Sequence, residues 1–149
     1  MKIKVAWVGK TKEPAIQTLT DEYLKRISQY AEVEGLAVKD EAAILTLASG
    51  DGRGARKERC KLVLLDARGK QYSSEELAAM LEREQMNGAP LLFAIGGSDG
   101  FSDMARREAG LVLSLGKMTL PHELARVVLV EQIYRAFTIL KNHPYHRGH

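Results

Sequence analysis

The sequence predicts an α/β fold in which a mainly parallel β-sheet is flanked by helices. Throughout the chain, short apolar stretches with strand periodicity alternate with segments whose apolar residues recur at helical spacing. Residues 61–66 and 90–95 are nearly continuous apolar runs, which are typical of strands buried on both faces of a parallel sheet. With 149 residues and 45% hydrophobic content, the chain has the size of one domain with one core. We therefore expect a single domain over residues 1–149.

The first unit of the N-terminal half is a strand followed by a helix. Ile3, Val5 and Trp7 alternate with polar or small residues and predict a strand that stops at Gly9. Pro14 suits the first position of a helix because its fixed φ fits there and no partner is needed for its nitrogen. The apolar residues that share one face of this helix are Ile16, Leu19, Tyr23, Leu24 and Ile27.

The sequence pattern predicts the second strand and helix less clearly. Val33, Leu36 and Val38 predict a strand that Gly35 weakens, and a short helix is expected over residues 41–48. Glycines in residues 50–54 break this helix.

The central unit begins with the buried strand over residues 61–66, which ends at an acid. The following helix starts with Ser73 and Glu76, whose spacing is that of a capping box, and it closes at residues 87–88, Asn-Gly.

The C-terminal half contains two more strands and the longest helix. The strand over residues 90–95 leads into a glycine-rich loop at residues 96–100, after which Ser102 caps a short helix, and residues 111–113 form the last strand. Pro121 opens the longest helix. The apolar residues expected on its buried face are Leu124, Val127, Val128, Tyr134, Phe137 and Leu140.

Three loops follow the carboxyl ends of predicted strands. They come after Asp66, after Ile95, and between Leu113 and Pro121. In parallel sheets ligands bind beyond these strand ends, so we expect the three loops to converge on one site.

The loop at residues 96–100 suits a close approach of backbone to a ligand, because glycine has no side chain. It matches neither the dinucleotide fingerprint nor a Walker A loop, and taken alone it is better explained as an ordinary strand-to-helix turn. The backbone groups of residues 115–122 are able to read a purine edge while Met118 covers a ring face. A plain connector to the helix explains the same residues.

The last nine residues hold three of the four histidines and no acid. Histidine and tyrosine exchange protons, arginine holds an anion or a phosphate, and Pro144 stiffens the backbone. The segment therefore predicts part of a site. A metal is not expected, because zinc needs three or four fixed ligands and His143 and His146 have no cysteine or acid nearby in sequence. These residues do not by themselves support hydrolysis.

The net charge of +3 is unevenly distributed. Residues 53–61 carry five basic side chains and one acid, and the chain after Glu131 carries three basic side chains and no acid. This excess suits a phosphate-rich partner, although a solvated basic face explains it equally well.

The apolar runs are too short to cross a membrane and the first residues lack a signal-peptide core, so we expect a cytoplasmic protein with no membrane partner.

Four ordered motifs carry a resemblance to a known family. They are residues 92–100 (LFAIGGSDG), 119–122 (TLPH), 131–136 (EQIYRA) and 142–147 (NHPYHR). Together they resemble the ribosomal RNA large subunit methyltransferase H family, which belongs to the SPOUT class of methyltransferases. Weaker likeness through residues 8–10, 23–26 and 65–66 extends the resemblance over nearly the whole chain.

The resemblance implies a homodimer that transfers a methyl group from S-adenosyl-L-methionine to N3 of a pseudouridine in large-subunit (23S) ribosomal RNA, on assembled ribosomes. It also implies a C-terminal trefoil knot, which base rates for folds would not suggest. The cofactor residues that it implies are Leu65, Gly96, Gly97, Leu115, Gly116, Lys117, Met118, Thr119 and Leu120. The chain departs from the family pattern at residues 98–99, where Ser-Asp stands for a more usual Pro-Glu, and at residues 116–118.

The chemistry of that reaction defines the tasks of the tail. The imide N3 is a poor nucleophile until its proton leaves, so a base or a stabiliser of the imide anion is required. The candidate catalytic residues are His143, Tyr145, His146 and Arg147, with Arg126 and His122 as further possibilities. Sequence does not rank them.

The alternative function is a non-catalytic ribosome- or RNA-binding module of the same fold. A small nucleotide hydrolase is disfavoured, because no phosphate-loop lysine is present.

Overall fold

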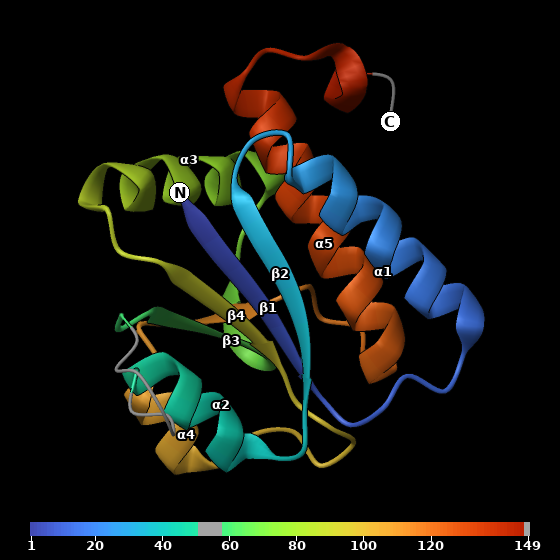
Figure 1. Cartoon of the computed structure of the whole chain (residues 1–149), viewed down its shortest axis with the longest axis vertical. Coiled ribbons are helices and arrows are strands. Elements are labelled where there is room, and N and C mark those ends of the chain that lie inside the picture. The colour runs from blue at the N-terminus through green and yellow to red at the C-terminus, as the bar shows by residue number, and fades with distance from the viewer. Residues whose placement is uncertain (51–57, 148–149) are drawn as a thin grey trace.

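In the computed structural model, which describes residues 1–50 and 58–147, five strands form one sheet in the order β2-β1-β4-β3-β5 (Figure 1). Every neighbouring pair of strands is parallel, which confirms the predicted sheet type. The strands are β1 Lys2–Val8, β2 Glu32–Val38, β3 Lys61–Gln71, β4 Leu91–Ile95 and β5 Leu111–Ser114. The helices are α1 Pro14–Ile27, α2 Glu41–Ser49, α3 Ser74–Asn87, α4 Asp103–Glu108 and α5 His122–Leu140, followed by the 3₁₀ helix η1 Pro144–Arg147.

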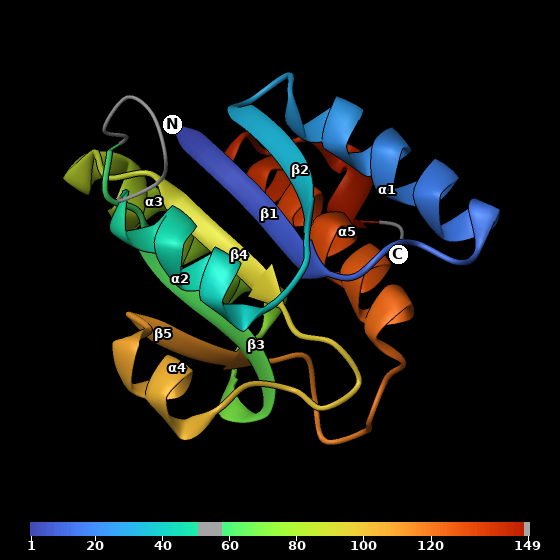
Figure 2. The same ribbon diagram turned by 60° about the horizontal axis from the view of Figure 1, so that its bottom comes forward.

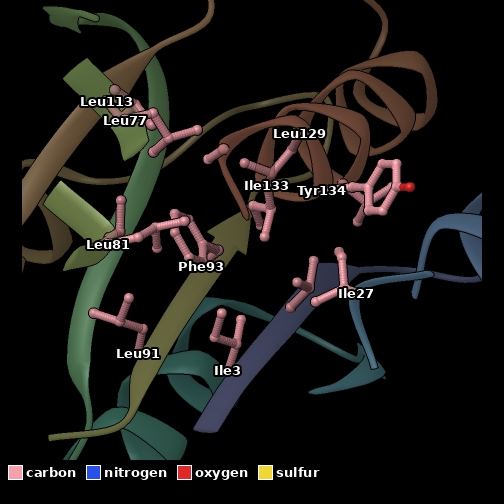
Figure 3. Close-up of a cluster of buried hydrophobic side chains, with 14 of the residues drawn as sticks. Ile3, Ile27, Leu77, Leu81, Leu91, Phe93, Leu113, Leu129, Ile133 and Tyr134 are labelled. Atoms are coloured by element: carbon pink, nitrogen blue, oxygen red, sulfur yellow. The ribbon is translucent and has the colours of Figure 1, made fainter. Parts of the chain in front are cut away.

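Helices cover both faces of the sheet, with α1, α3 and α5 on one face and α2 and α4 on the other (Figures 1 and 2). The alternating direction of the side chains of β4 shows why. Leu91, Phe93 and Ile95 belong to the apolar cluster under α1, α3 and α5, whereas Leu92 and Ala94 belong to the cluster under α2 and α4. Successive side chains of a strand point to opposite faces, so a continuous apolar run fills two cores. Figure 3 shows the larger cluster, in which strand residues meet side chains of α1, α3 and α5.

The predicted helix boundaries are confirmed where capping chemistry defines them. Ser73 and Glu76 form the capping box of α3, and Gly88 ends that helix at a φ of 81°. The Ser102 hydroxyl accepts a hydrogen bond from the Ala105 amide at 3.1 Å and caps α4. Gly50 ends α2 in the left-handed conformation, as expected, whereas residues 51–54 of the predicted break lie outside the described residues.

Strand β3 is longer than the sequence predicted. It continues past Asp66 to Gln71, and its pairing with β5 shifts register, because Leu113 pairs with both Leu65 and Lys70. Residues 66–69 therefore bulge out of the ladder. The bulge requires Gly69, where a Cβ atom would lie only 2.5 Å from the carbonyl oxygen of Val112.

The predicted apolar faces of α1 and α5 are partly wrong. Leu19 and Leu124 are exposed, whereas Arg126 is buried beside Leu129 and Val130. The reason is tertiary, because α5 packs against α1 and α3 as well as the sheet and so buries a broader stripe than one helical face. The trefoil knot implied by the resemblance stays a prediction.

Candidate active site

The bulge of β3 and the carboxyl ends of β4 and β5 meet at a cavity of about 340 Å³ beside the first turn of α5. Its walls come from residues 65–68, 95–100, 115–116 and 118–120, with His122 and Ala125 of α5. Figure 2 shows these loops gathered at one edge of the sheet. The volume lies in the range of small-molecule sites. The three predicted segments do converge on one cavity, but the segment after Asp66 is a bulge within β3 and not a loop that follows the strand.

Most of the residues predicted to bind a cofactor line this cavity. They are Leu65, Gly96, Gly97, Leu115, Gly116, Met118, Thr119 and Leu120. Lys117 does not line the cavity and is exposed. Its neighbours face the cavity on either side of it, so the charged side chain is left to solvent.

The two glycines after β4 differ in their surroundings. A Cβ atom on Gly96 would lie 3.2 Å from the carbonyl carbon and oxygen of Gly100, because the loop folds back on itself there. A Cβ atom on Gly97 would meet only Val8, at 3.6 Å, which is an ordinary contact. The close return of the loop therefore depends on Gly96.

An ion pair between Asp66 and Arg106 joins two walls of the cavity. Arg106 Nη1 lies 3.1 Å from Asp66 Oδ2 in the β3 bulge and donates to the carbonyl oxygen of Phe101 at 2.7 Å. Only 10% of the Asp66 side chain and 18% of the Arg106 side chain are exposed. Hydrogen bonds to Asp103 and then to Asp66 raise the pKa of Arg106. Sequence reasoning missed Arg106, since no local pattern indicates a pairing across 40 positions.

The β1–α1 loop, residues 9–13, reaches the same edge of the sheet and is fixed to α5. The Glu123 carboxylate accepts hydrogen bonds from the backbone amides of Lys12 and Glu13, at 3.1 and 3.2 Å. Arg126 donates to the Thr11 hydroxyl at 2.7 Å and stacks on the Trp7 ring at 4.0 Å. Burial lowers the pKa of Arg126. The structure therefore places Arg126 beneath this loop and outside the cavity lining.

The tail lies at the far end of α5 from the cavity (Figure 1). Helix α5 has 19 residues, which at 1.5 Å per residue separates its two ends by about 28 Å. The structure therefore does not bring His143, Tyr145, His146 and Arg147 together with the cavity within one chain.

Tyr145 anchors the tail to α5 and α1. Its hydroxyl donates to Glu131 Oε2 at 2.9 Å and lies 3.3 Å from the Tyr23 hydroxyl, and its ring meets Tyr134 edge-on at 4.7 Å. Burial raises the pKa of Tyr145 well above its usual value, and the hydrogen bonds with Tyr23 and Glu131 raise it further. The phenol therefore keeps its proton at any ordinary working pH.

The other tail residues are less constrained. His143 Nδ1 accepts the Tyr145 amide hydrogen at 3.1 Å, so the proton of a neutral His143 ring sits on Nε2. Within residues 1–50 and 58–147, the buried Nδ1 of His146 has no hydrogen-bond partner. Arg147 donates to the side-chain oxygen of Asn142 and is exposed. His146 and Arg147 thus keep more free hydrogen-bonding capacity than Tyr145.

The described residues offer neither a cluster of metal ligands nor a membrane-spanning helix. In that part of the chain, no group of three or more histidine, cysteine, aspartate or glutamate side chains is placed to hold a metal ion. No helix there has the length and apolar character that a membrane span requires.

Known proteins resemble this chain over its whole length. A family model described as Predicted SPOUT methyltransferase matches residues 1–146. Ribosomal RNA large subunit methyltransferase H of Koribacter versatilis (strain Ellin345) is 57% identical over 150 residues, which is 100% of each chain.

Solved structures share the fold at low sequence identity. A probable methylase family protein from Haemophilus influenzae Rd KW20 is 15% identical with a TM-score of 0.57, covering 96% of this chain and 69% of its own. The SpoU methyltransferase AviRb from Streptomyces viridochromogenes, solved in complex with AdoMet, is 12% identical with a TM-score of 0.50 and covers 90% and 57%. These two matches concern the fold alone. From the family model and the full-length relative, the chain belongs to the SPOUT methyltransferases, in the ribosomal RNA large subunit methyltransferase H family.

Proposed function

We propose that this protein transfers a methyl group from S-adenosyl-L-methionine to N3 of a pseudouridine in large-subunit (23S) ribosomal RNA, on assembled ribosomes. The observation that carries the proposal is the single cavity formed by the three loops where the family resemblance expects the cofactor. The 57% identical relative, whose name states ribosomal RNA methylation, supports the substrate class.

The cavity suits the cofactor in size and in lining. Leu65, Ile95 and Leu115 offer apolar surface for a purine ring, and the loop backbones offer polar groups for its edge. The space that a Cβ on Gly96 would fill is already taken by the backbone of Gly100, so the loop is shaped by backbone alone. AviRb, which shares the fold, was solved with the same cofactor. When bound, the cofactor supplies a methyl group that its sulfonium already activates.

The chain must hold the target base in line and remove its N3 proton. We assign proton removal to His146, because its imidazole as a whole is only half-buried and no described residue fixes the ring through a hydrogen bond to Nδ1. Arg147, which is exposed, stabilises the imide anion that results. Tyr145 is assigned a positioning role, because its hydroxyl is bonded to Glu131 and its pKa is raised. His143 supports the turn by accepting the Tyr145 amide hydrogen.

The separation of tail and cavity calls for a second subunit. In a two-fold dimer with antiparallel α5 helices, the tail of each chain reaches the cavity of the other. Exposed apolar side chains on α1 and α5 support this packing, since Leu19 and Leu124 are 44% and 48% exposed on helices that contact each other. The proposed active site is therefore shared between two subunits.

Methylation of ribosomes with labelled cofactor tests the proposal. Ribosomes from a strain that lacks this gene should gain one N3-methylpseudouridine, detected by mass spectrometry of digested ribosomal RNA, and should be a better substrate than free ribosomal RNA. A variant that lacks residues 143–149 should bind the cofactor normally and methylate nothing. Failure of the wild-type protein to bind the cofactor would favour a non-catalytic binding module instead.

A further inference from the structure

The β1–α1 loop, residues 9–13, stands beside the cavity without lining it. The two are neighbours, because the position of a Cβ on Gly97 lies 3.6 Å from Val8 at the end of β1. They also share the first turns of α5, where His122 lines the cavity and Glu123 binds the loop.

The loop is held in one position by two side chains of α5. Glu123 accepts the amide hydrogens of Lys12 and Glu13, and Arg126 holds the Thr11 hydroxyl from below. Arg126 is only 1% exposed and, among the described residues, forms no ion pair with a carboxylate. Burying a guanidinium without a direct ion pair is costly, and the contacts with Trp7 and Thr11 and the attraction of the carboxylates of Glu123 and Asp21 offset part of that cost. The contacts of Glu123 and Arg126 therefore indicate that the β1–α1 loop must be held in this position for its function.

The fixed loop presents two free positive charges. Lys10 and Lys12 are exposed, and neither ammonium forms an ion pair or hydrogen bond with a described residue. The nearby carboxylate of Glu123 is occupied by backbone amides. The two lysines are therefore available to an anionic partner at the edge of the sheet where the cavity opens.

We propose that Lys10 and Lys12 bind backbone phosphates of ribosomal RNA next to the target nucleotide, and that Glu123 and Arg126 position the loop for this contact. The inference rests on the proposed function. A base that reaches the cofactor at the mouth of the cavity leaves its flanking phosphates outside, along the same edge, and lysine contacts to phosphate fix the register of a nucleic acid. Each such contact also adds to the salt dependence of binding.

Replacing both lysines tests this proposal. The double variant Lys10→Ala, Lys12→Ala should raise KM for ribosomes by roughly tenfold, and the slope of log Kd for ribosomes against log salt should become shallower by about two. Affinity for S-adenosyl-L-methionine should not change. The matched control is Lys2→Ala with Arg83→Ala, which removes two exposed cations elsewhere and should leave KM and the slope as in the wild type. The double variant Lys10→Arg, Lys12→Arg should retain tight binding.

Two results would overturn the inference while the wild-type protein still methylates ribosomes. One is a KM and a salt slope equal to those of the control. The other is an equal loss of cofactor affinity, which would make the loop part of the cofactor site. Absence of methyl transfer by the wild type would instead contradict the proposed function. For the positioning role, Thr11→Val removes the acceptor of Arg126 without changing charge, and it should raise KM for ribosomes by about threefold. An unchanged KM would contradict that role.

Discussion

Gly96 and Gly97 are adjacent in sequence, yet a side chain at each position meets different neighbours. An added methyl group at position 96 would press on the backbone of Gly100, whereas at position 97 it would touch Val8 at a normal distance. Overpacking of this kind costs about 1–3 kcal/mol.

We therefore expect Gly96→Ala to weaken cofactor binding by roughly tenfold and Gly97→Ala to weaken it by less than about threefold. Calorimetric titration of S-adenosyl-L-methionine measures both values. Lys117→Ala provides a control in the same region and should bind normally, because Lys117 does not line the cavity. Equal affinities for the two glycine variants would show that the loop does not hold the cofactor as proposed.

In the proposed mechanism, Tyr145 positions the tail and does not act as the base. Its raised pKa means that the folded protein holds the phenolic proton more tightly than the unfolded chain does. Its contribution to stability is therefore intact below pH of about 10, the ordinary tyrosine value, and is lost as the pH rises further.

Removing the hydroxyl with Tyr145→Phe should cost about 1 kcal/mol of folding free energy, because the hydrogen bond to Glu131 is lost while the ring contacts remain. Turnover should fall by roughly tenfold with an unchanged pH profile, since the base is another group. His146→Ala should lose far more activity. A pH profile of Tyr145→Phe that lacks one limb of the wild-type curve would make Tyr145 the base.

At the scale of elements, the predictable features were those encoded by neighbouring residues. The run at residues 91–95 specifies a strand buried on both faces, and Ser73 with Glu76 specifies the start of α3. The length of β3 was not predictable, because its bulge depends on how Gly69 meets Val112 of another strand. The buried face of α5 was mispredicted for the same reason, since Arg126 is buried through Trp7 and Thr11, which are distant in sequence.

The site shows the same limit. The alternation of strands and helices was enough to predict that the segment after Asp66 and the loops after β4 and β5 form one cavity. The sequence also predicted that the tail belongs to the site. It could not show that α5 separates the tail from the cavity of the same chain.

The pair of Asp66 and Arg106 links the β3 bulge to the loop after β4. We expect Arg106→Ala to weaken cofactor binding several-fold, because both walls of the cavity lose a shared partner. Asp66→Asn should have a similar effect, and the double variant should be little worse than either single variant, as a direct interaction requires. Arg107→Ala, one position away and outside the cavity lining, should bind the cofactor normally. Additive losses of affinity would indicate that the two side chains act independently.

At the scale of the whole molecule, the proposed function requires two subunits. The protein should sediment with twice the 16.5 kDa mass of the chain. Leu124→Asp should produce an inactive monomer, because burying a leucine contributes about 1.5–3 kcal/mol to an interface, whereas an aspartate suits the start of a helix. Met104→Asp, an exposed position in the first turn of α4, is the control and should remain dimeric. A dimer that persists in Leu124→Asp would place the interface elsewhere.

The most direct test of the shared active site is the activity of a mixed dimer. One subunit carries a bulky substitution of Gly96 that blocks its cavity, and the other lacks residues 143–149. The two chains are co-expressed with different tags and purified as heterodimers, and methylation of ribosomes is measured. A site built from the tail of one chain and the cavity of the other leaves one intact site in each mixed dimer, so the activity should be about half that of the wild type. A mixed dimer no more active than the two inactive parent dimers would contradict the account.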